Sequence, residues 1–450
     1  MIRFLLRLGA GYSPRTRRLL GTAAASYGAR FGAAATLIIT IPLANATMAP
    51  DRFGVWMMLG AMLGFFAFAD LGIGNGVLNR VSEAAHRQQP EEASRIMRAG
   101  YACTFAASLL LCAAWGLWVA LADDPLAFAG SVAEPLRAEA LRGFTAFVLL
   151  LALNLPLQLV QKFQLAYQDG HWVGVSQLAC SLASLAALPI ALWNRADLAT
   201  LMFCTLGLQA AVNVVSTLWW FARSGLAPQL AEARVERQTL APLLRTGGLF
   251  FALQLSAAFA FQSDAFVITQ LLGPAAYGEF AAIQRIFLSM STLVGAALVG
   301  LWPAFGHALT SGDVAWARKA YFRALLIGVG SMGGLSVLVT LGMPWIASDW
   351  LRAAVPPPLA LPLVLSVWAV LETAGQVTGS LLNGAGMVRV QVVVAVAMAA
   401  TSFGVKWLLV PVLGAWGAVV ATIVAYSLIS VPVQIWLLAS LLGRSRWRPP

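Results

Sequence analysis

The sequence predicts an all-α polytopic membrane protein, with twelve transmembrane helices arranged as two six-helix bundles. Of the 450 residues, 60% are hydrophobic and only 10% are charged, which leaves too little polar surface to solvate a globule of this length. The apolar residues form runs that reach the roughly 20 residues a helix needs to cross a bilayer. An internal repeat divides these runs into two halves.

The first half begins with a basic segment, residues 1–18, which we expect in the cytoplasm. Residues 19–222 then form the first bundle. Pro156 lies inside the fourth span and predicts a kink, because proline lacks the N–H that a helix needs. The six spans are predicted at Leu19–Leu43, Phe53–Leu78, Ala99–Leu121, Gly143–Leu165, Trp172–Trp193 and Leu198–Ala222.

The second half follows a polar cytoplasmic linker, residues 223–242. Residues 243–442 form the second bundle, and residues 443–450 form a basic cytoplasmic tail. Gly273 and Pro274 break the apolar sequence between the first two spans of this bundle. The six spans are predicted at Leu249–Leu272, Phe280–Pro303, Ala320–Trp345, Leu359–Leu382, Val388–Val410 and Gly414–Leu442.

The basic residues orient these helices. With both termini in the cytoplasm, most of the 29 Lys and Arg residues fall in cytoplasmic segments, as the positive-inside rule requires. The segments assigned to the other side contain Arg52, Arg137, Arg142, Arg195 and Arg352. Membrane orientation therefore explains the formal charge of +11, and nucleic acid is not expected as a partner.

Short motifs recur in the same order in the two halves. The first pair is Met48-Ala-Pro50-Asp-Arg-Phe53-Gly54 and Leu272-Gly-Pro274-Ala-Ala-Tyr277-Gly278; the later pairs are Arg98-Ala-Gly-Tyr101 with Arg318-Lys-Ala-Tyr321, and Gly170 with Gly386. Because each half has six spans, the repeats have the same orientation across the membrane. Transporters built this way bind their substrates between the two repeats.

Six ionisable residues lie inside the predicted spans. Exposing a charge to lipid costs about 2.5–3.5 kcal/mol, so such residues normally face the interior of the bundle or a cavity. They are Arg30, Arg285, Lys406, Asp70, Asp264 and Glu372. Each one either lines a path through the membrane or belongs to a structural ion pair.

No enzyme is expected from this sequence. It contains no nucleophile and base pair, no metal cluster and no phosphate-binding loop, so no cofactor is expected either. The three histidines are predicted to be cytoplasmic, and the longest loop on the opposite side, Ala122 to Arg142, is short and mostly acidic. The four cysteines fall within apolar runs without metal-ligand spacing.

Taken together, the duplicated spans and their motifs resemble the oligosaccharide flippases of the MOP superfamily, the Wzx-type exporters of O-antigen and exopolysaccharide. The matching stretches are Asp70-Leu-Gly-Ile-Gly-Asn-Gly, Leu272-Gly-Pro-Ala-Ala-Tyr277-Gly, Leu301-Trp-Pro-Ala-Phe305, Leu382-Asn-Gly-Ala-Gly386 and Gly414-Ala-Trp-Gly417-Ala. The resemblance implies a bacterial inner-membrane transporter that flips undecaprenyl-pyrophosphate-linked repeat units to the periplasmic leaflet, coupled to an ion gradient. It also implies membrane lipids, a polysaccharide polymerase and a chain-length regulator as partners.

On this resemblance Arg30 is the best candidate for binding a pyrophosphate, because a guanidinium offers two parallel donors and stays charged when buried. An ion pair with Asp70 or Glu372 is the structural alternative. Arg285 and Lys406 are further candidates for substrate binding. For these two residues the alternatives are an Arg285–Asp264 pair and a Lys406 ammonium that reaches the membrane surface.

The acidic residues Asp70, Asp264 and Glu372 are candidates for ion coupling or gating, and Glu372 could carry a coupling proton. Gln158, Gln161 and Gln376 could bind sugar hydroxyls; hydrogen bonds between helices are the alternative.

A cation or drug antiporter of the MATE type, from the same superfamily, is the alternative function. It would be favoured if acidic rather than basic groups faced the central cavity.

Overall fold

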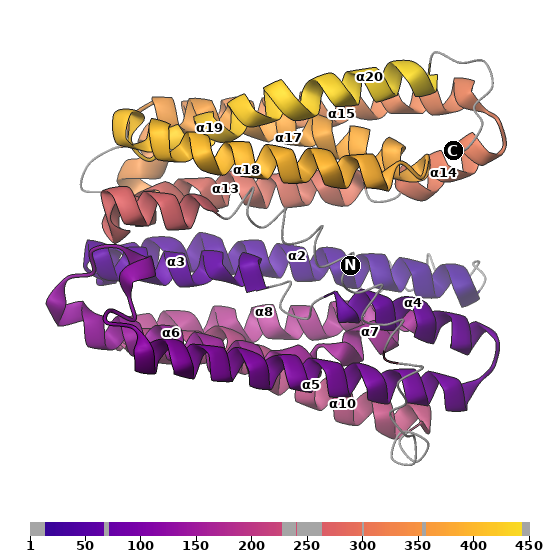
Figure 1. Cartoon of the computed structure of the whole chain (residues 1–450), viewed down its shortest axis with the longest axis horizontal. Coiled ribbons are helices and arrows are strands. Elements are labelled where there is room, and N and C mark those ends of the chain that lie inside the picture. The colour runs from indigo at the N-terminus through magenta and orange to yellow at the C-terminus, as the bar shows by residue number, and fades with distance from the viewer. Residues whose placement is uncertain are drawn as a thin grey trace. The chain divides into compact units, whose positions relative to one another are not determined.

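The described residues of the computed structural model form helices joined by short turns, with no strand among them (Figure 1). The model describes residues 14–66, 72–226, 240, 263–298, 301–352 and 357–442. Nine helices in this part of the chain are long and apolar enough to cross a membrane. The other three predicted spans, the second, seventh and eighth, each include residues outside the described ranges. The all-α membrane fold predicted from the sequence is confirmed.

The chain divides into two compact units, and each is described by itself. Unit 1 comprises Met1–Leu43, Phe66–Pro125 and Ala138–Ala252. Unit 2 comprises Ala44–Phe65, Leu126–Arg137 and Leu253–Pro450. Two stretches of the first predicted bundle therefore pack with unit 2.

Unit 1 is built from α2, α4 to α10 and a π-helical turn. Their bounds are α2 Pro14–Thr47, α4 Ile73–His86, α5 Pro90–Leu121, α6 Glu134–Leu157, α7 Leu159–Ala166, α8 Gly170–Trp193, α9 Leu198–Met202, the π turn Phe203–Gly207 and α10 Leu208–Ser224. Helix α4 packs against α5 and α7, and α8 packs against α10. Phe163 of α7 is fully buried there and meets the rings of Tyr101 and Trp220.

Unit 2 contains α3 and the second half of the chain. Its elements are α3 Pro50–Phe66, η2 Ala127–Ala129, the helix Ser263–Leu272, α13 Pro274–Leu298, α14 Leu301–Thr310, α15 Val314–Leu341, α16 Met343–Trp345, the π turn Ile346–Trp350, α17 Ala360–Gly384, α18 Val388–Leu413, α19 Gly417–Ala425, the π turn Tyr426–Ser430 and α20 Val431–Leu442. Helix α15 packs along α17, and α18 packs along α19.

Several helices begin earlier than the hydropathy of the sequence predicts. Helix α5 starts at Pro90 rather than Ala99, and α15 starts at Val314 rather than Ala320. The cause is local: Pro90 occupies the first turn of α5, where a missing N–H costs nothing, and the Asp313 side chain accepts a hydrogen bond from the N–H of Trp316. Hydropathy marks the part of a helix that lies in lipid, whereas capping residues mark where the helix starts.

The fourth span is interrupted where its proline predicted a kink. Helix α6 contains Pro156 and ends at Leu157, and α7 begins at Leu159 after the turn residue Gln158. Asn154, one turn before the break, donates a hydrogen bond from Nδ2 to the carbonyl of Leu206, at 3.0 Å. Leu206 belongs to the π-helical turn, where widened backbone geometry leaves carbonyls available to such donors.

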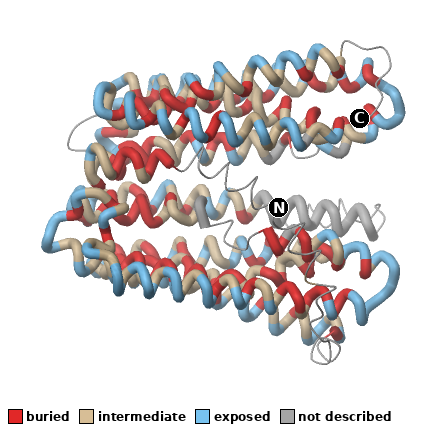
Figure 2. The backbone as a smooth tube through the Cα atoms, in the orientation of Figure 1, coloured by how far each residue is buried: buried red, intermediate tan, exposed pale blue. Residues whose placement is uncertain are grey.

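The burial pattern is that of helices packed on one side only (Figure 2). In α15 the buried residues recur at helical spacing, among them Ala317, Tyr321 and Gly328. Large apolar side chains such as Leu326 and Leu341 lie on other faces and are 76% and 75% exposed. An apolar surface of this size is expected of a helix that faces lipid rather than water.

The repeated motif marks equivalent helix starts in the two halves. Pro50 is the first residue of α3 and Pro274 is the first residue of α13. The glycines of the two motifs also meet within unit 2. A Cβ atom on Gly54 would lie 1.9 Å from the carbonyl oxygen of Pro274, and a Cβ atom on Gly278 would lie 3.0 Å from the Cα of Gly54. Glycine at both positions therefore permits backbone contact between α3 and α13.

Candidate functional site

A buried ion pair joins α18 to the helix Ser263–Leu272. The Nζ of Lys406 lies 2.7 Å from Oδ1 of Asp264 and donates a hydrogen bond to Oγ of Ser263 at 2.8 Å. Gln284 of α13 donates from Nε2 to the other carboxylate oxygen, at 3.2 Å. Because Lys406 is 0% exposed, its ammonium does not reach the membrane surface. Asp264 pairs with Lys406 and not with Arg285, which was the alternative drawn from the sequence.

Arg285 of α13 is half-buried against α3. One of its terminal nitrogens lies 3.2 Å from the position that a Cβ atom would take on Gly60. No carboxylate of the described residues lies within ion-pair distance of this guanidinium. The missing side chain of Gly60 therefore leaves room for the Arg285 guanidinium. No described residue of unit 2 forms an ion pair with this guanidinium.

Glu372 lies in the middle of α17 and faces α13. The hydroxyl of Ser291 donates to its Oε2 at 3.1 Å, and Nε2 of Gln376 lies 3.5 Å from its Oε1. The Oε1 of Gln376 would lie 2.9 Å from a Cβ on Gly295. The absence of a side chain at Gly295 therefore leaves space for the Gln376 amide. Glu372 thus has polar partners but no cationic partner among the described residues.

Tyr426 packs against α17 at Trp368 and Gly375. Tyr426 begins the π turn before α20, and its hydroxyl exchanges hydrogen bonds with the amide of Gln434. The same hydroxyl would lie 2.2 Å from a Cβ on Gly375, and the ring packs edge-on against Trp368. These contacts join α17 to the π turn, and the π turn to α20.

Unit 1 contains a separate polar chain. Gln161 of α7 donates to the Asn213 side chain at 3.0 Å, and Asn213 donates to Asn154 at 3.3 Å. Asn154 and Asn213 are buried, at 0% and 1% exposure. These contacts show that Gln161 is a link between helices, while Gln158 is the half-buried turn residue between α6 and α7.

The remaining predicted residues are Arg30 and Asp70. Arg30 is half-buried on α2 in unit 1. Asp70 lies outside the described residues. The structure thus brings Asp264 to Lys406, and Glu372 to Gln376, within unit 2. The substrate-binding and coupling roles of all nine residues stay predictions.

Sequence reasoning missed the polar partners of the charged residues. Ser263, Gln284 and Ser291 each contact a charged side chain of unit 2, and Asn213 links the polar chain of unit 1. The available signal was the presence of polar residues inside apolar runs. Such residues seek hydrogen-bond partners on other helices, because lipid offers none.

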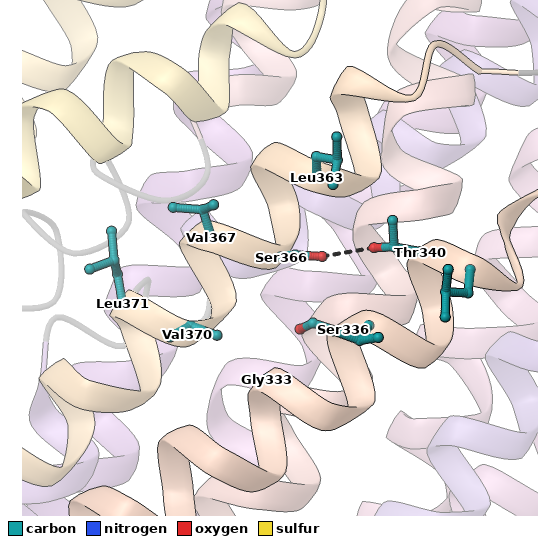
Figure 3. Close-up of a pocket in the computed structure, with 10 residues that line it drawn as sticks. Gly333, Ser336, Thr340, Leu363, Ser366, Val367, Val370 and Leu371 are labelled. Carbon is teal, nitrogen blue, oxygen red and sulfur yellow. Dashed lines mark hydrogen bonds between the residues drawn. The ribbon is translucent and has the colours of Figure 1, made fainter.

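An uncharged groove lies on the surface of unit 2 between α15 and α17 (Figure 3). Its volume is about 530 Å³, and Gly333, Ser336, Thr340 and Ser366 lie among its apolar residues. Thr340 and Ser366 are hydrogen-bonded across it, at 3.0 Å. None of the predicted charged residues lines this groove, so it is not the site that those residues define.

The comparisons with solved structures define the class of the fold. The chain is similar to a multidrug resistance MATE family transporter of the MOP superfamily in an inward-facing conformation, with a TM-score of 0.79, 14% identity, and coverage of 92% of this chain and 98% of that chain. An outward-facing MATE family structure gives a TM-score of 0.67 at 14% identity, covering 96% and 97%. A MOP superfamily transporter from Pyrococcus furiosus, described as having a binding pocket of reverse polarity, gives 0.59 at 15% identity, covering 92% and 96%.

These likenesses show that the chain has the fold of the MOP superfamily transporters. A search of curated protein sequences found no match. The model of the polysaccharide biosynthesis protein family matches residues 22–309. The chain belongs to this family.

Proposed function

We propose that the protein is a membrane transporter that flips undecaprenyl-pyrophosphate-linked oligosaccharide repeat units from the cytoplasmic to the periplasmic leaflet. It would act in the bacterial inner membrane, by alternating access, for the export of O-antigen or exopolysaccharide. The observation that carries the proposal is the family: membership of the polysaccharide biosynthesis proteins, together with a transporter fold, supports a saccharide-containing substrate.

The charges in unit 2 support an anionic substrate group. Lys406 neutralises Asp264, whereas no described carboxylate neutralises Arg285. An Arg guanidinium can hold two phosphate oxygens at once and keeps its charge in a desolvated site. Arg285 is therefore our candidate for the pyrophosphate in unit 2, and Arg30, on α2 of unit 1, stays the candidate drawn from the sequence.

Glu372 supports coupling to a cation gradient. Its carboxylate accepts from Ser291 and lies near Gln376, so its protonated and ionised forms both find hydrogen-bond partners. A carboxyl group that is stable in both forms can exchange a proton during a transport cycle. In this proposal Glu372 binds the coupling proton and the arginines bind the substrate.

The test is complementation of a strain that lacks a known flippase, scored for surface polysaccharide. The parent chain should restore export, and Arg285→Ala and Arg30→Ala should reduce it strongly. Arg285→Lys should restore it in part, because Lys keeps the charge but loses the paired donors. Arg389→Ala is the matched control, because Arg389 is an exposed arginine on α18, and this variant should behave like the parent.

A MATE-type cation or drug antiporter is the second candidate. It is favoured by the carboxylate of Glu372, which has no cationic partner among the described residues. An ethidium efflux assay on the same strains separates the two functions. Efflux that depends on Glu372 but not on Arg285, without any restored polysaccharide, would replace the flippase proposal.

A further inference from the structure

A hollow of about 400 Å³ lies between α14 and the first turns of α15 in unit 2. It is lined by two basic residues, Lys319 and Arg323, and by apolar residues that include Leu301, Ala320 and Ile327. Trp316 also lines it, and its ring packs edge-on against the fully buried Phe305 of α14. The hollow therefore offers cationic and apolar groups to the same ligand.

The position of this hollow along α15 corresponds to a membrane surface. Helix α15 has 28 residues and spans about 42 Å at 1.5 Å per residue, which exceeds the roughly 30 Å of bilayer hydrocarbon. The three basic residues of α15, Arg318, Lys319 and Arg323, all lie near its start, so the excess length belongs at this end and the first turns lie outside the hydrocarbon. Farther along the helix Ile327 is 64% exposed, as expected of a side chain in lipid. Lys319 and Arg323 lie between these two regions, at the level where lipid headgroups begin.

The positive charges of Lys319 and Arg323 make the hollow suited to an anion. Lys319 and Arg323 are four residues apart, so they share one face of α15 and repel each other. Both are exposed, and neither has an ion pair or a side-chain hydrogen bond among the described residues. An anion placed between the two side chains would remove this repulsion. An anionic lipid would also cover the apolar residues of the hollow with its hydrocarbon chain.

We propose that this hollow, lined by Trp316, Lys319, Arg323 and the apolar residues Leu301, Ala320, Ala324 and Ile327, binds the phosphate of an anionic lipid. Lys319 and Arg323 hold the phosphate oxygens, and the lipid chain lies along Leu301, Ala320 and Ile327. Basic pockets of this kind between transmembrane helices are suited to phosphate headgroups. The proposal does not depend on which substrate the protein transports.

The test uses native mass spectrometry of the full chain in detergent, titrated with dioleoyl phosphatidylglycerol. Lys319→Gln/Arg323→Gln should weaken binding of this lipid at least about tenfold, since two charge-assisted hydrogen bonds are lost. Ala320→Trp should weaken it comparably by filling the hollow without changing any charge. Binding of dioleoyl phosphatidylcholine, which carries no net charge, should change little in either variant.

The matched control is Arg318→Gln/Arg389→Gln. This pair removes the same charge from exposed positions outside the hollow, and it should change phosphatidylglycerol binding less than about threefold. Equal weakening by the two pairs, or full binding by Ala320→Trp, would overturn the proposal, because the surface charge alone would then attract the lipid. Melting curves in detergent serve as the folding control for all variants.

Competition with geranylgeranyl diphosphate separates the two sources of lipid phosphate. If the diphosphate displaces half of the bound phosphatidylglycerol at a concentration below that of the phosphatidylglycerol, the hollow is assigned to polyprenyl diphosphates. If it does so only at a concentration above that of the phosphatidylglycerol, the hollow is assigned to phospholipids of the surrounding leaflet. The double variant should weaken whichever lipid binds.

Discussion

At the scale of single residues, the ion pair between Asp264 and Lys406 makes unit 2 sensitive to the loss of either side chain, because both are buried. A buried ion pair offsets its own desolvation only while both partners are present, and loss of one partner costs about 3–5 kcal/mol. Asp264→Asn and Lys406→Met should therefore each destabilise the protein strongly. Asp264→Leu/Lys406→Met should cost less than the sum of the two, because it leaves no buried charge unpaired.

Thermal unfolding in detergent, followed by tryptophan fluorescence, measures these differences. Arg389→Met is the control, since Arg389 is an exposed residue of the same helix and should leave the melting temperature nearly unchanged. Strictly additive losses in the double variant would show that the two side chains do not act as a pair.

Glu372 permits a second experiment on one side chain. In Glu372→Gln an amide of the same shape can still accept a hydrogen bond from Ser291 and lie beside Gln376, so stability should change by less than about 1 kcal/mol. The amide does not titrate. Transport measured in proteoliposomes should therefore lose its dependence on the pH gradient, while the melting temperature stays close to that of the parent. A transport rate that still follows the pH gradient would remove Glu372 from the coupling mechanism.

At the scale of helices, the contact between α3 and α13 depends on the repeated glycines. A Cβ on Gly54 would lie 1.9 Å from a backbone oxygen, which a side-chain rotation cannot relieve. Gly54→Ala should therefore push the two helices apart and destabilise unit 2 by about 1–3 kcal/mol.

The control for Gly54→Ala is another glycine inside a helix. A Cβ on Gly330 of α15 would meet no atom within 4 Å, so Gly330→Ala should be neutral or stabilising by about 0.5–1 kcal/mol through helix propensity alone. A melting temperature that falls in Gly54→Ala but stays level or rises in Gly330→Ala supports the close contact between α3 and α13. A melting temperature for Gly54→Ala equal to that of Gly330→Ala would contradict it.

Hydropathy predicted the nine spans found among the described residues, because burial in lipid requires long apolar runs. Pro156 predicted the break before α7 because of its missing N–H. The sequence did not predict which charged residues form ion pairs. Whether Asp264 meets Lys406 or Arg285 depends on how each helix is rotated about its own axis. That rotation is set by packing between helices that are distant in sequence, and no local pattern records it.

At the scale of the whole molecule, the two halves share more than their number of spans. The last helix of each half contains a π-helical turn, at Phe203–Gly207 in the first half and at Tyr426–Ser430 in the second. In each half a polar side chain links this turn to the fourth helix. In the first half, Asn154 of the fourth helix donates a hydrogen bond to Leu206 of the turn. In the second half, Tyr426 of the turn packs over Gly375 of the fourth helix. The repeat has therefore kept a structural irregularity as well as a sequence motif. Such irregular turns often occur at functional sites.

The orientation of the whole chain in the membrane rests on the basic residues and can be measured directly. Ser311 lies in the exposed turn before α15, which the positive-inside rule places in the cytoplasm, and Asp123 lies in the exposed loop after α5, which the rule places on the other side. In a background without the four native cysteines, Asp123→Cys should react with a membrane-impermeant maleimide in intact cells. Ser311→Cys should react only after the cells are opened. The reverse labelling pattern would invert the topology, and the lipid site at Lys319 and Arg323 would then lie in the outer leaflet.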